Sequence, residues 1–293
     1  KVGLWLLLQT VVHTGLLQLL WSGQAMQNCG NKLSVGHQVN KMATLNVMQW
    51  GAQDSTKTIV GLHGITANAG AMTEPARMLA ERGWQFTAPD MRGHGESTRA
   101  NGDFSFDSLL EDFAENIPLE PDLLIGHSFG GTLAQLGVLK GIFNPKTLLL
   151  EDPVSYFPNQ NIPMEMLAWD EENLPHDIEG LIELNPKWSR RDATWKLLSL
   201  EQVDFDDARA AFAGNAPWDL RSDVSELVAK VPTVWVLPEE SRFVSIEDKA
   251  NLRKEAGGRA VNVVPNVGHS VHRDDTEAFV EIVEQLANGT WFN

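Results

Sequence analysis

The chain has 293 residues, of which 43% are hydrophobic and 21% charged, and its 39 acidic and 23 basic side chains give a net charge of −16. This length and composition fit one large domain, or one domain with an inserted cap, and exclude a wholly disordered chain. The acidic balance argues against nucleic-acid binding, because no net positive field is present to attract phosphates. The single Cys29 excludes intrachain disulfides and cysteine-based zinc or iron–sulfur sites.

The first 41 residues differ from the rest of the chain. Residues 4–21 form an apolar run that Gln, His, Thr and Gly interrupt, and Ser-Gly-Gln-Ala follows at 22–25. Three interpretations stay open: an extension that is not native to the domain, a signal peptide or membrane anchor, and a packed amphipathic helix. We expect a cytoplasmic protein, or a secreted one if residues 1–25 are a signal peptide. Membrane contact is expected only if this segment is a true anchor.

From Met42 onward, short apolar runs alternate with amphipathic segments. Met42–Trp50 resembles a first strand, and the runs after it are Thr58–Leu62, Trp84–Ala88, Leu123–Ile125, Thr147–Leu150, Thr233–Leu237 and Ala260–Val264. Helical patterns lie near residues 70–82, 105–116, 129–142, 245–256 and 274–288. This alternation predicts an α/β fold with a mostly parallel central sheet and helices on both faces. Such sheets bind ligands at the carboxyl ends of their strands.

The alternation breaks between residues 154 and 218, where helical spacing and scattered prolines occur without an obvious strand. We interpret residues 154–218 as an inserted helical cap, with residues 42–153 and 219–293 forming the core. Met164, Met166, Leu167 and Trp169 are the densest apolar cluster of this segment, and we expect them to form the wall of a substrate pocket. The alternative is that these side chains only pack the cap against the core.

The strongest functional signal is the motif Gly126-His-Ser128-Phe-Gly130, which follows an apolar run and precedes a helical pattern. In a strand–turn–helix context, this pattern is typical of a nucleophile elbow. The serine then occupies a strained turn, and the two glycines remove side chains that would collide with the crowded flanks. The hydroxyl projects at a helix N-terminus, whose dipole favours developing negative charge.

A serine hydroxyl needs a base to act as a nucleophile. His269 is the best candidate, because it follows the last predicted strand and therefore lies at the same sheet edge as Ser128. His272, three residues further on, is the competitor and is better explained as a solvated or structural residue. His127 flanks the nucleophile, so its side chain points away from Ser128, and we expect it to support the site by packing.

The chain resembles the α/β-hydrolase superfamily. The motifs that carry the resemblance are Leu62-His-Gly-Ile-Thr66, Pro89–Ser97, the elbow at 126–130 and Gly268-His269. They appear in the family's order and span about four fifths of the chain. The resemblance implies an oxyanion hole formed by the backbone N–H groups of Ile65 and Phe129. It also implies that the Asp90–Ser97 segment is a structural turn held by an internal polar network.

The acidic partner of the histidine is where the sequence departs from the common family pattern. Relatives often carry an aspartate just after the strand at 233–237, and here Ser241 stands at that point. A serine cannot stabilise an imidazolium as a carboxylate does. Some family members take the acid from the earlier strand end, where Asp152 stands here. We therefore assign Asp152 as the acid, and Glu151, Glu239 and Glu240 stay open as alternatives.

These residues predict acyl transfer on a small-molecule carboxylic ester through an acyl-enzyme, with Ser128, His269 and Asp152 as the catalytic triad. A lactonase or a carbon–carbon hydrolase would use the same triad. A catalytically slow, receptor-like binding protein is the alternative from another functional class.

No cofactor is implied, since the sequence contains no dinucleotide fingerprint and no phosphate-binding loop. His269, His272, Asp274 and Asp275 could be imagined as metal ligands. Solvated charge at a helix start is the commoner explanation of such a cluster.

Overall fold

The computed structural model describes residues 43–99, 103–158 and 161–292, so the interpretations of residues 1–41 lie outside the described residues. Residues 41–293 form one compact unit. Within the described ranges, no helix combines the length and the apolar character needed to cross a bilayer.

A seven-stranded sheet forms the centre of this unit, in the order β1-β3-β2-β4-β5-β8-β9. The strands are β1 (Val47–Trp50), β2 (Thr58–Leu62), β3 (Gln85–Pro89), β4 (Leu123–His127), β5 (Thr147–Glu151), β8 (Thr233–Pro238) and β9 (Val261–Val264). Only β1 pairs antiparallel, against β3, and all other pairs in the sheet are parallel. The predicted α/β fold is confirmed.

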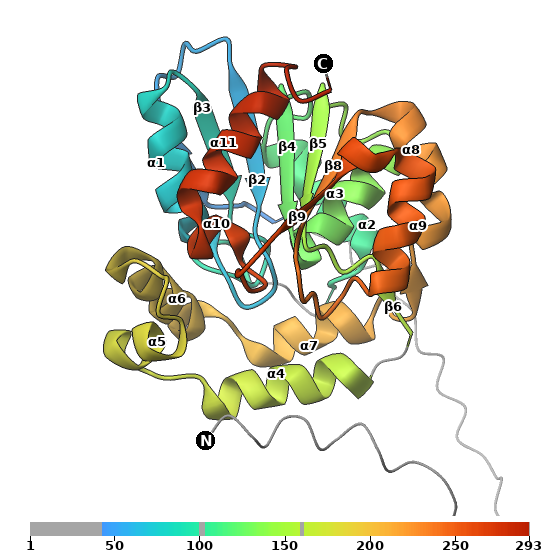
Figure 1. The fold of residues 1–293 in the computed structure, drawn as a ribbon. Coiled ribbons are helices and arrows are strands. Elements are labelled where there is room, and N and C mark those ends of the chain that lie inside the picture. Colours follow the sequence, from blue (N-terminus) through green and yellow to red (C-terminus); the bar gives the residue numbers. More distant parts are fainter. Residues whose placement is uncertain (1–42, 100–102, 159–160, 293) are drawn as a thin grey trace, which may run out of the picture. The chain divides into compact units, whose positions relative to one another are not determined.

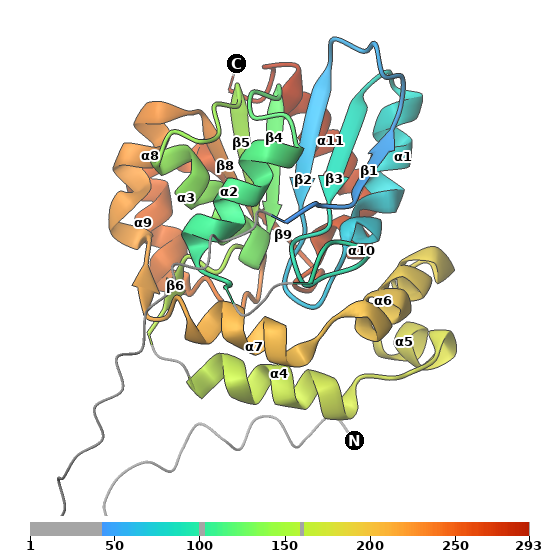
Figure 2. The same ribbon diagram turned by 180° about the vertical axis from the view of Figure 1, so that it is seen from behind.

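Helices cover both faces of the sheet (Figures 1 and 2). One face carries α1 (Thr73–Glu81), α10 (Val271–Asp274) and α11 (Thr276–Ala287), and the other carries α2 (Phe106–Asn116), α3 (Phe129–Leu139), α8 (Val224–Lys230) and α9 (Ile246–Ala256). Short 3-10 helices occur at Ala69–Met72, Arg221–Asp223 and Gly258–Ala260.

Alternate residues of each strand supply the two hydrophobic cores. Leu124 of β4 packs into the core under α2 and α3, whereas its neighbours Leu123 and Ile125 pack into the core under α1 and α11. Successive side chains of a strand point to opposite faces. The strands are therefore apolar throughout, as the sequence indicated, because neither face of the sheet is left to solvent.

The segment between β5 and α8 contains four α-helices, which lie beyond the carboxyl ends of the strands (Figure 1). They are α4 (Asn161–Asn173), α5 (Ile178–Leu184), α6 (Arg190–Gln202) and α7 (Phe205–Ala213). Two short strands, β6 (Tyr156–Phe157) and β7 (Trp218–Asp219), pair antiparallel at the two ends of this segment. Sequence analysis did not predict this pair, because a two-residue strand is too short to show a periodicity.

Aromatic packing holds this segment to the core. Trp218 stacks on Phe212 with ring centroids 5.8 Å apart, and its indole N–H donates to the carbonyl of Val154 at 2.8 Å. Phe129, the residue after the elbow serine, packs 5.3 Å from Phe212. Trp218 therefore acts as an anchor in the structure, with both its ring and its polar N–H satisfied.

The turn after β3 is held by a buried polar network. Asp90 accepts hydrogen bonds from the backbone N–H groups of Ala69 at 2.6 Å and Glu96 at 3.0 Å. Arg92 forms an ion pair with Asp112 of α2 at 2.5 Å, and their side chains are 6% and 1% exposed. These contacts place this turn firmly against α2.

We expect Arg92→Met to lower the free energy of unfolding by about 3–5 kcal/mol, because it leaves the buried Asp112 carboxylate without its partner. Arg77→Met is the matched control, since Arg77 pairs with Glu81 at the surface. That change should cost at most about 0.5 kcal/mol. Urea unfolding followed by circular dichroism measures the free energy of unfolding of both variants. Equal decreases in the two variants would contradict the conclusion that the buried Arg92–Asp112 pair stabilises the fold.

Candidate active site

Ser128 occupies a sharp turn between β4 and α3. Its backbone has φ 55° and ψ −119°, which is a strained conformation for a residue with a side chain. A Cβ added at Gly130 would lie 2.4 Å from the carbonyl oxygens of Leu62 and His63, and one at Gly126 would lie 2.7 Å from that of Gly130. Only glycine at positions 126 and 130 allows α3 to start this close to the end of β2.

The loop that follows β2 lies against the elbow. A Cβ on Gly64 would sit 3.0 Å from the Ser128 Cβ, so loop and serine are in direct contact. Lys196 of α6 fixes the loop by donating to the Thr66 carbonyl at 2.9 Å and to its hydroxyl at 3.2 Å. Of the two sequence-predicted oxyanion residues, Ile65 lies in this loop and lines the same cavity as Ser128, and Phe129 is the first residue of α3.

His269 lies in the loop between β9 and α10, and its Nδ1 is 2.7 Å from the Asp152 Oδ2. Asp152 follows β5, is 1% exposed and adopts φ 38°, so its side chain turns out of the strand direction toward the histidine. The His269 side chain is 32% exposed. The structure thus places the sequence-predicted base and acid in contact across 117 residues of chain.

Ser241 lies after β8, at the position where the common family pattern has an aspartate. Its hydroxyl donates to the second oxygen of Asp152 at 2.5 Å, and it accepts from the backbone N–H groups of Phe243 and Val244. The alternatives Glu239 and Glu240 are exposed after β8. Sequence reasoning noted Ser241 as a departure but did not foresee that its hydroxyl would hold the carboxylate from the neighbouring strand.

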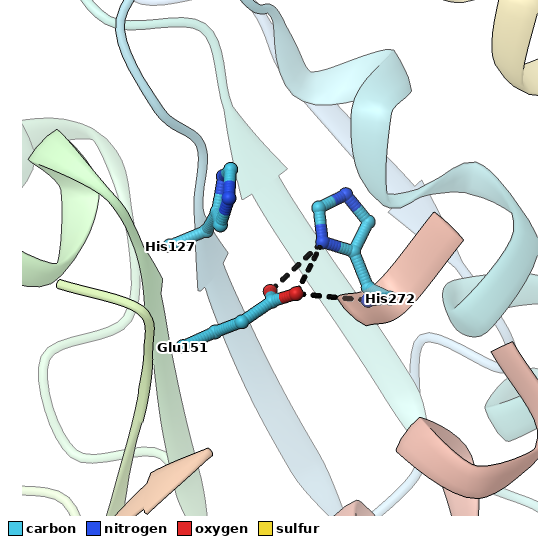
Figure 3. A group of neighbouring side chains, drawn as sticks. All are labelled: His127, Glu151 and His272. Atoms are coloured by element: carbon cyan, nitrogen blue, oxygen red, sulfur yellow. Dashed lines mark hydrogen bonds and ion pairs between the residues drawn. The ribbon is translucent and has the colours of Figure 1, made fainter. Parts of the chain in front are cut away.

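Glu151, the remaining alternative, pairs with His272 instead (Figure 3). Its carboxylate oxygens lie 2.9 and 2.8 Å from the His272 Nδ1, and one also accepts from the His272 backbone N–H at 2.8 Å. Both side chains are almost wholly buried. Burial raises the pKa of Glu151 and lowers that of His272 to about 3. His272 is therefore a buried structural residue and not a solvated one.

His127 lies on the other side of Glu151 (Figure 3), and burial lowers its pKa well below the usual value. Its Nε2 lies 3.1 Å from the carbonyl oxygen of His269 and must carry the proton there, because a carbonyl only accepts. This bond ties the residue before the elbow serine to the loop that carries His269. The packing role expected for His127 thus includes a specific hydrogen bond.

Among the described residues, His127, Glu151 and His272 form a group that could hold a metal ion. One ligand atom from each of His127, Glu151 and His272 lies within 4.8 Å of the others. Imidazole nitrogen and carboxylate oxygen are donors that suit zinc and similar metals. The Nδ1 of His272 is engaged by Glu151, whereas its buried Nε2 has no hydrogen-bond partner within the described residues.

Ser128 and His269 line one cavity of about 150 Å³. Ile65 and Met166 also line it, whereas Leu167 is buried in the core, Met164 packs against that core and Trp169 is exposed on the surface. The sequence analysis did not assign several other lining residues to a site, among them Asp170, Trp188, Lys196, Arg242, Phe243 and Arg273. The charged residues of this set gave no signal in the sequence, because isolated charged residues are usually solvated.

Comparison with known proteins places the chain in a family. The profile of the alpha/beta hydrolase family matches residues 59–282, which is most of the chain. The chain belongs to this family. Its elbow, its histidine loop and its acidic strand end all fall within the matched region.

Individual relatives of this alpha/beta hydrolase are distant. The chain is 24% identical over 244 residues to the sn-1-specific diacylglycerol lipase ABHD11 of Mus musculus, covering 77% of this chain and 79% of that protein. It is 26% identical over 242 residues to the pimeloyl-[acyl-carrier protein] methyl ester esterase of Pseudoalteromonas atlantica, covering 77% and 92%. The solved esterase from Exiguobacterium antarcticum superposes with a TM-score of 0.66 at 18% identity, covering 84% and 96%.

We expect Gly130→Ala to move the 63–66 loop away from Ser128, because the added methyl would collide with the carbonyl oxygens of Leu62 and His63. Such overpacking typically costs about 1–3 kcal/mol of stability. Gly258→Ala is the matched control, since a Cβ there meets no atom within 4 Å. Thermal unfolding of both variants measures the effect, and an unchanged Tm for Gly130→Ala would contradict the close packing of elbow and loop.

Proposed function

We propose that this alpha/beta hydrolase is a serine hydrolase that cleaves carboxylic esters through an acyl-enzyme. One observation carries the proposal: Ser128, on a strained turn at a helix N-terminus, lines the same cavity as His269, whose other side is held by Asp152. Similarity to the Mus musculus diacylglycerol lipase and to the Pseudoalteromonas atlantica methyl ester esterase supports ester substrates.

In the proposed reaction, the Ser128 hydroxyl attacks the ester carbonyl and gives its proton to His269. The Nδ1 of His269 is engaged by Asp152, so Nε2 takes this proton. The backbone N–H groups of Ile65 and Phe129 stabilise the tetrahedral oxyanion. In the part of the chain that the structure describes, neither of these N–H groups has a hydrogen-bond partner, so both are free to donate.

Collapse of the tetrahedral intermediate breaks the ester bond, and His269 gives its proton to the leaving alcohol. Water then attacks the acyl-enzyme with His269 as the base, and the acid product leaves with Ser128 regenerated. Asp152 stabilises the imidazolium in both halves of the reaction. Ser241 positions Asp152, because its hydroxyl occupies the carboxylate oxygen that does not face the histidine.

We expect the folded protein to react covalently with a fluorophosphonate probe and to release p-nitrophenol from p-nitrophenyl esters. Ser128→Ala should abolish labelling and lower ester turnover by at least about 10³-fold, because the nucleophile is removed. Gel fluorescence and absorbance measure the two readouts. A folded wild-type protein that neither labels nor turns over esters of any acyl length would contradict the proposed function.

We expect Asp152→Asn to reduce kcat by about 10³- to 10⁴-fold, because an amide favours the wrong tautomer of the His269 imidazole. Glu239→Gln is the matched control, since this acid lies on the surface after β8. Its kcat should stay within about twofold of the wild-type value. If Asp152→Asn keeps more than a tenth of the activity, Asp152 is not the triad acid.

A further inference from the structure

The cavity beside Ser128 carries an excess of positive charge, although the whole chain has a net charge of −16. Three cationic residues line it, namely Lys196, Arg242 and Arg273, and Asp170 is its only acidic lining residue within the described ranges. Burial raises the pKa of Asp170, which favours its neutral form. The larger neighbouring cavity, of about 240 Å³, has the opposite balance, with Glu247, Asp248 and Glu255 against one arginine.

Arg273 is a buried cation whose guanidinium lacks a hydrogen-bond partner at one nitrogen within the described part of the chain. Its side chain is 6% exposed, and its Nε has no hydrogen-bond partner. The guanidinium stacks over the ring of Trp188, another lining residue, at 4.6 Å from the ring centroid. Arg273 belongs to none of the ion pairs formed within the described ranges. A buried guanidinium without a carboxylate is costly unless an anion completes its surroundings.

Three carboxylates attract the charge of Arg273, namely those of Asp192, Glu151 and Asp274, and each of them accepts hydrogen bonds from other groups. Asp192 accepts from the backbone and side chain of Ser189, and Glu151 is held by His272. Asp274 accepts from the Trp188 indole at 2.9 Å and from the Gly268 backbone N–H at 2.5 Å. Each of these acids is thus engaged by other donors, and Arg273 itself lines the cavity.

Lys196 supplies a second buried cation, from a different helix. It is 9% exposed, and burial together with Arg273 lowers its pKa to about 8. Its ammonium donates to the Thr66 carbonyl and hydroxyl, and an ammonium has three protons, so one is left for a ligand. Two buried cations thus converge on the cavity from α10 and α6.

We propose that this cavity is an anion subsite that recognises a carboxylate on the acyl group, so that the substrates are short half-esters of dicarboxylic acids. Arg273 binds the carboxylate, with Lys196 as the second donor, while the ester carbonyl lies at Ser128. The volume of about 150 Å³ favours a short acyl chain. This inference rests on the proposed function for its reaction, but the binding of the anion does not depend on turnover.

The kinetic test compares mono-p-nitrophenyl glutarate with its methyl ester, a neutral diester that releases the same chromophore. We expect wild-type kcat/KM to favour the charged probe by at least tenfold. Arg273→Gln should reduce that preference at least tenfold, as for a lost charge-assisted contact. Arg221→Gln, which alters the cation of the other cavity, should leave the preference unchanged.

The binding test uses Ser128→Ala protein, in which no turnover occurs. Glutarate should raise its Tm, because a ligand that binds only the folded state stabilises it, and the shift should disappear when Arg273→Gln is added. Lys196→Met provides a second variant on another helix if Arg273→Gln does not fold, and it should also diminish the shift.

Three results would overturn the subsite: equal preference for the two probes, a preference that survives both variants, or no stabilisation by glutarate. Failure of the proposed function is recognised separately, because wild-type protein would then not label with fluorophosphonate even if glutarate stabilised it.

Discussion

The contact between His269 and Asp152 is the interaction on which the rest of the site depends. The two residues come from the loop after β9 and the end of β5, and β8 lies between those strands. The histidine loop must therefore cross the end of β8 to reach its acid. The Ser241 hydroxyl at the end of β8 bonds to the same carboxylate, so three successive strand ends are joined at one point.

The two buried histidines near this contact, His127 and His272, do not accept a proton readily. Burial lowers the pKa values of His127 and His272, so both stay neutral near pH 7 and serve as hydrogen-bonding groups. All three line the cavity, but His269 is the one whose side chain is substantially exposed, at 32%. The neutral pair supports the histidine loop without competing for the proton that the proposed reaction moves.

The charge of the cavity follows from how the inserted helices meet the core. Lys196 comes from α6 and Arg273 from α10, and neither would face the other without that contact. Burial lowers the pKa of Lys196, and repulsion from Arg273 lowers it further; a bound carboxylate would offset both costs. The acidic exterior offsets the positive charge of the cavity only weakly, because water and salt screen exposed charges that lie more than a Debye length away.

The sequence by itself determined the fold class and the elbow, because apolar strands, helical periodicity and the glycines around Ser128 are local signals. It also pointed to His269 and Asp152 through their positions after predicted strands. Only the tertiary structure decided that Ser241 holds Asp152, that Glu151 pairs with His272, and that Arg273 and Lys196 share a cavity. Those contacts join residues that lie far apart in the chain, and no periodicity or motif records which distant side chains meet when the sheet is assembled.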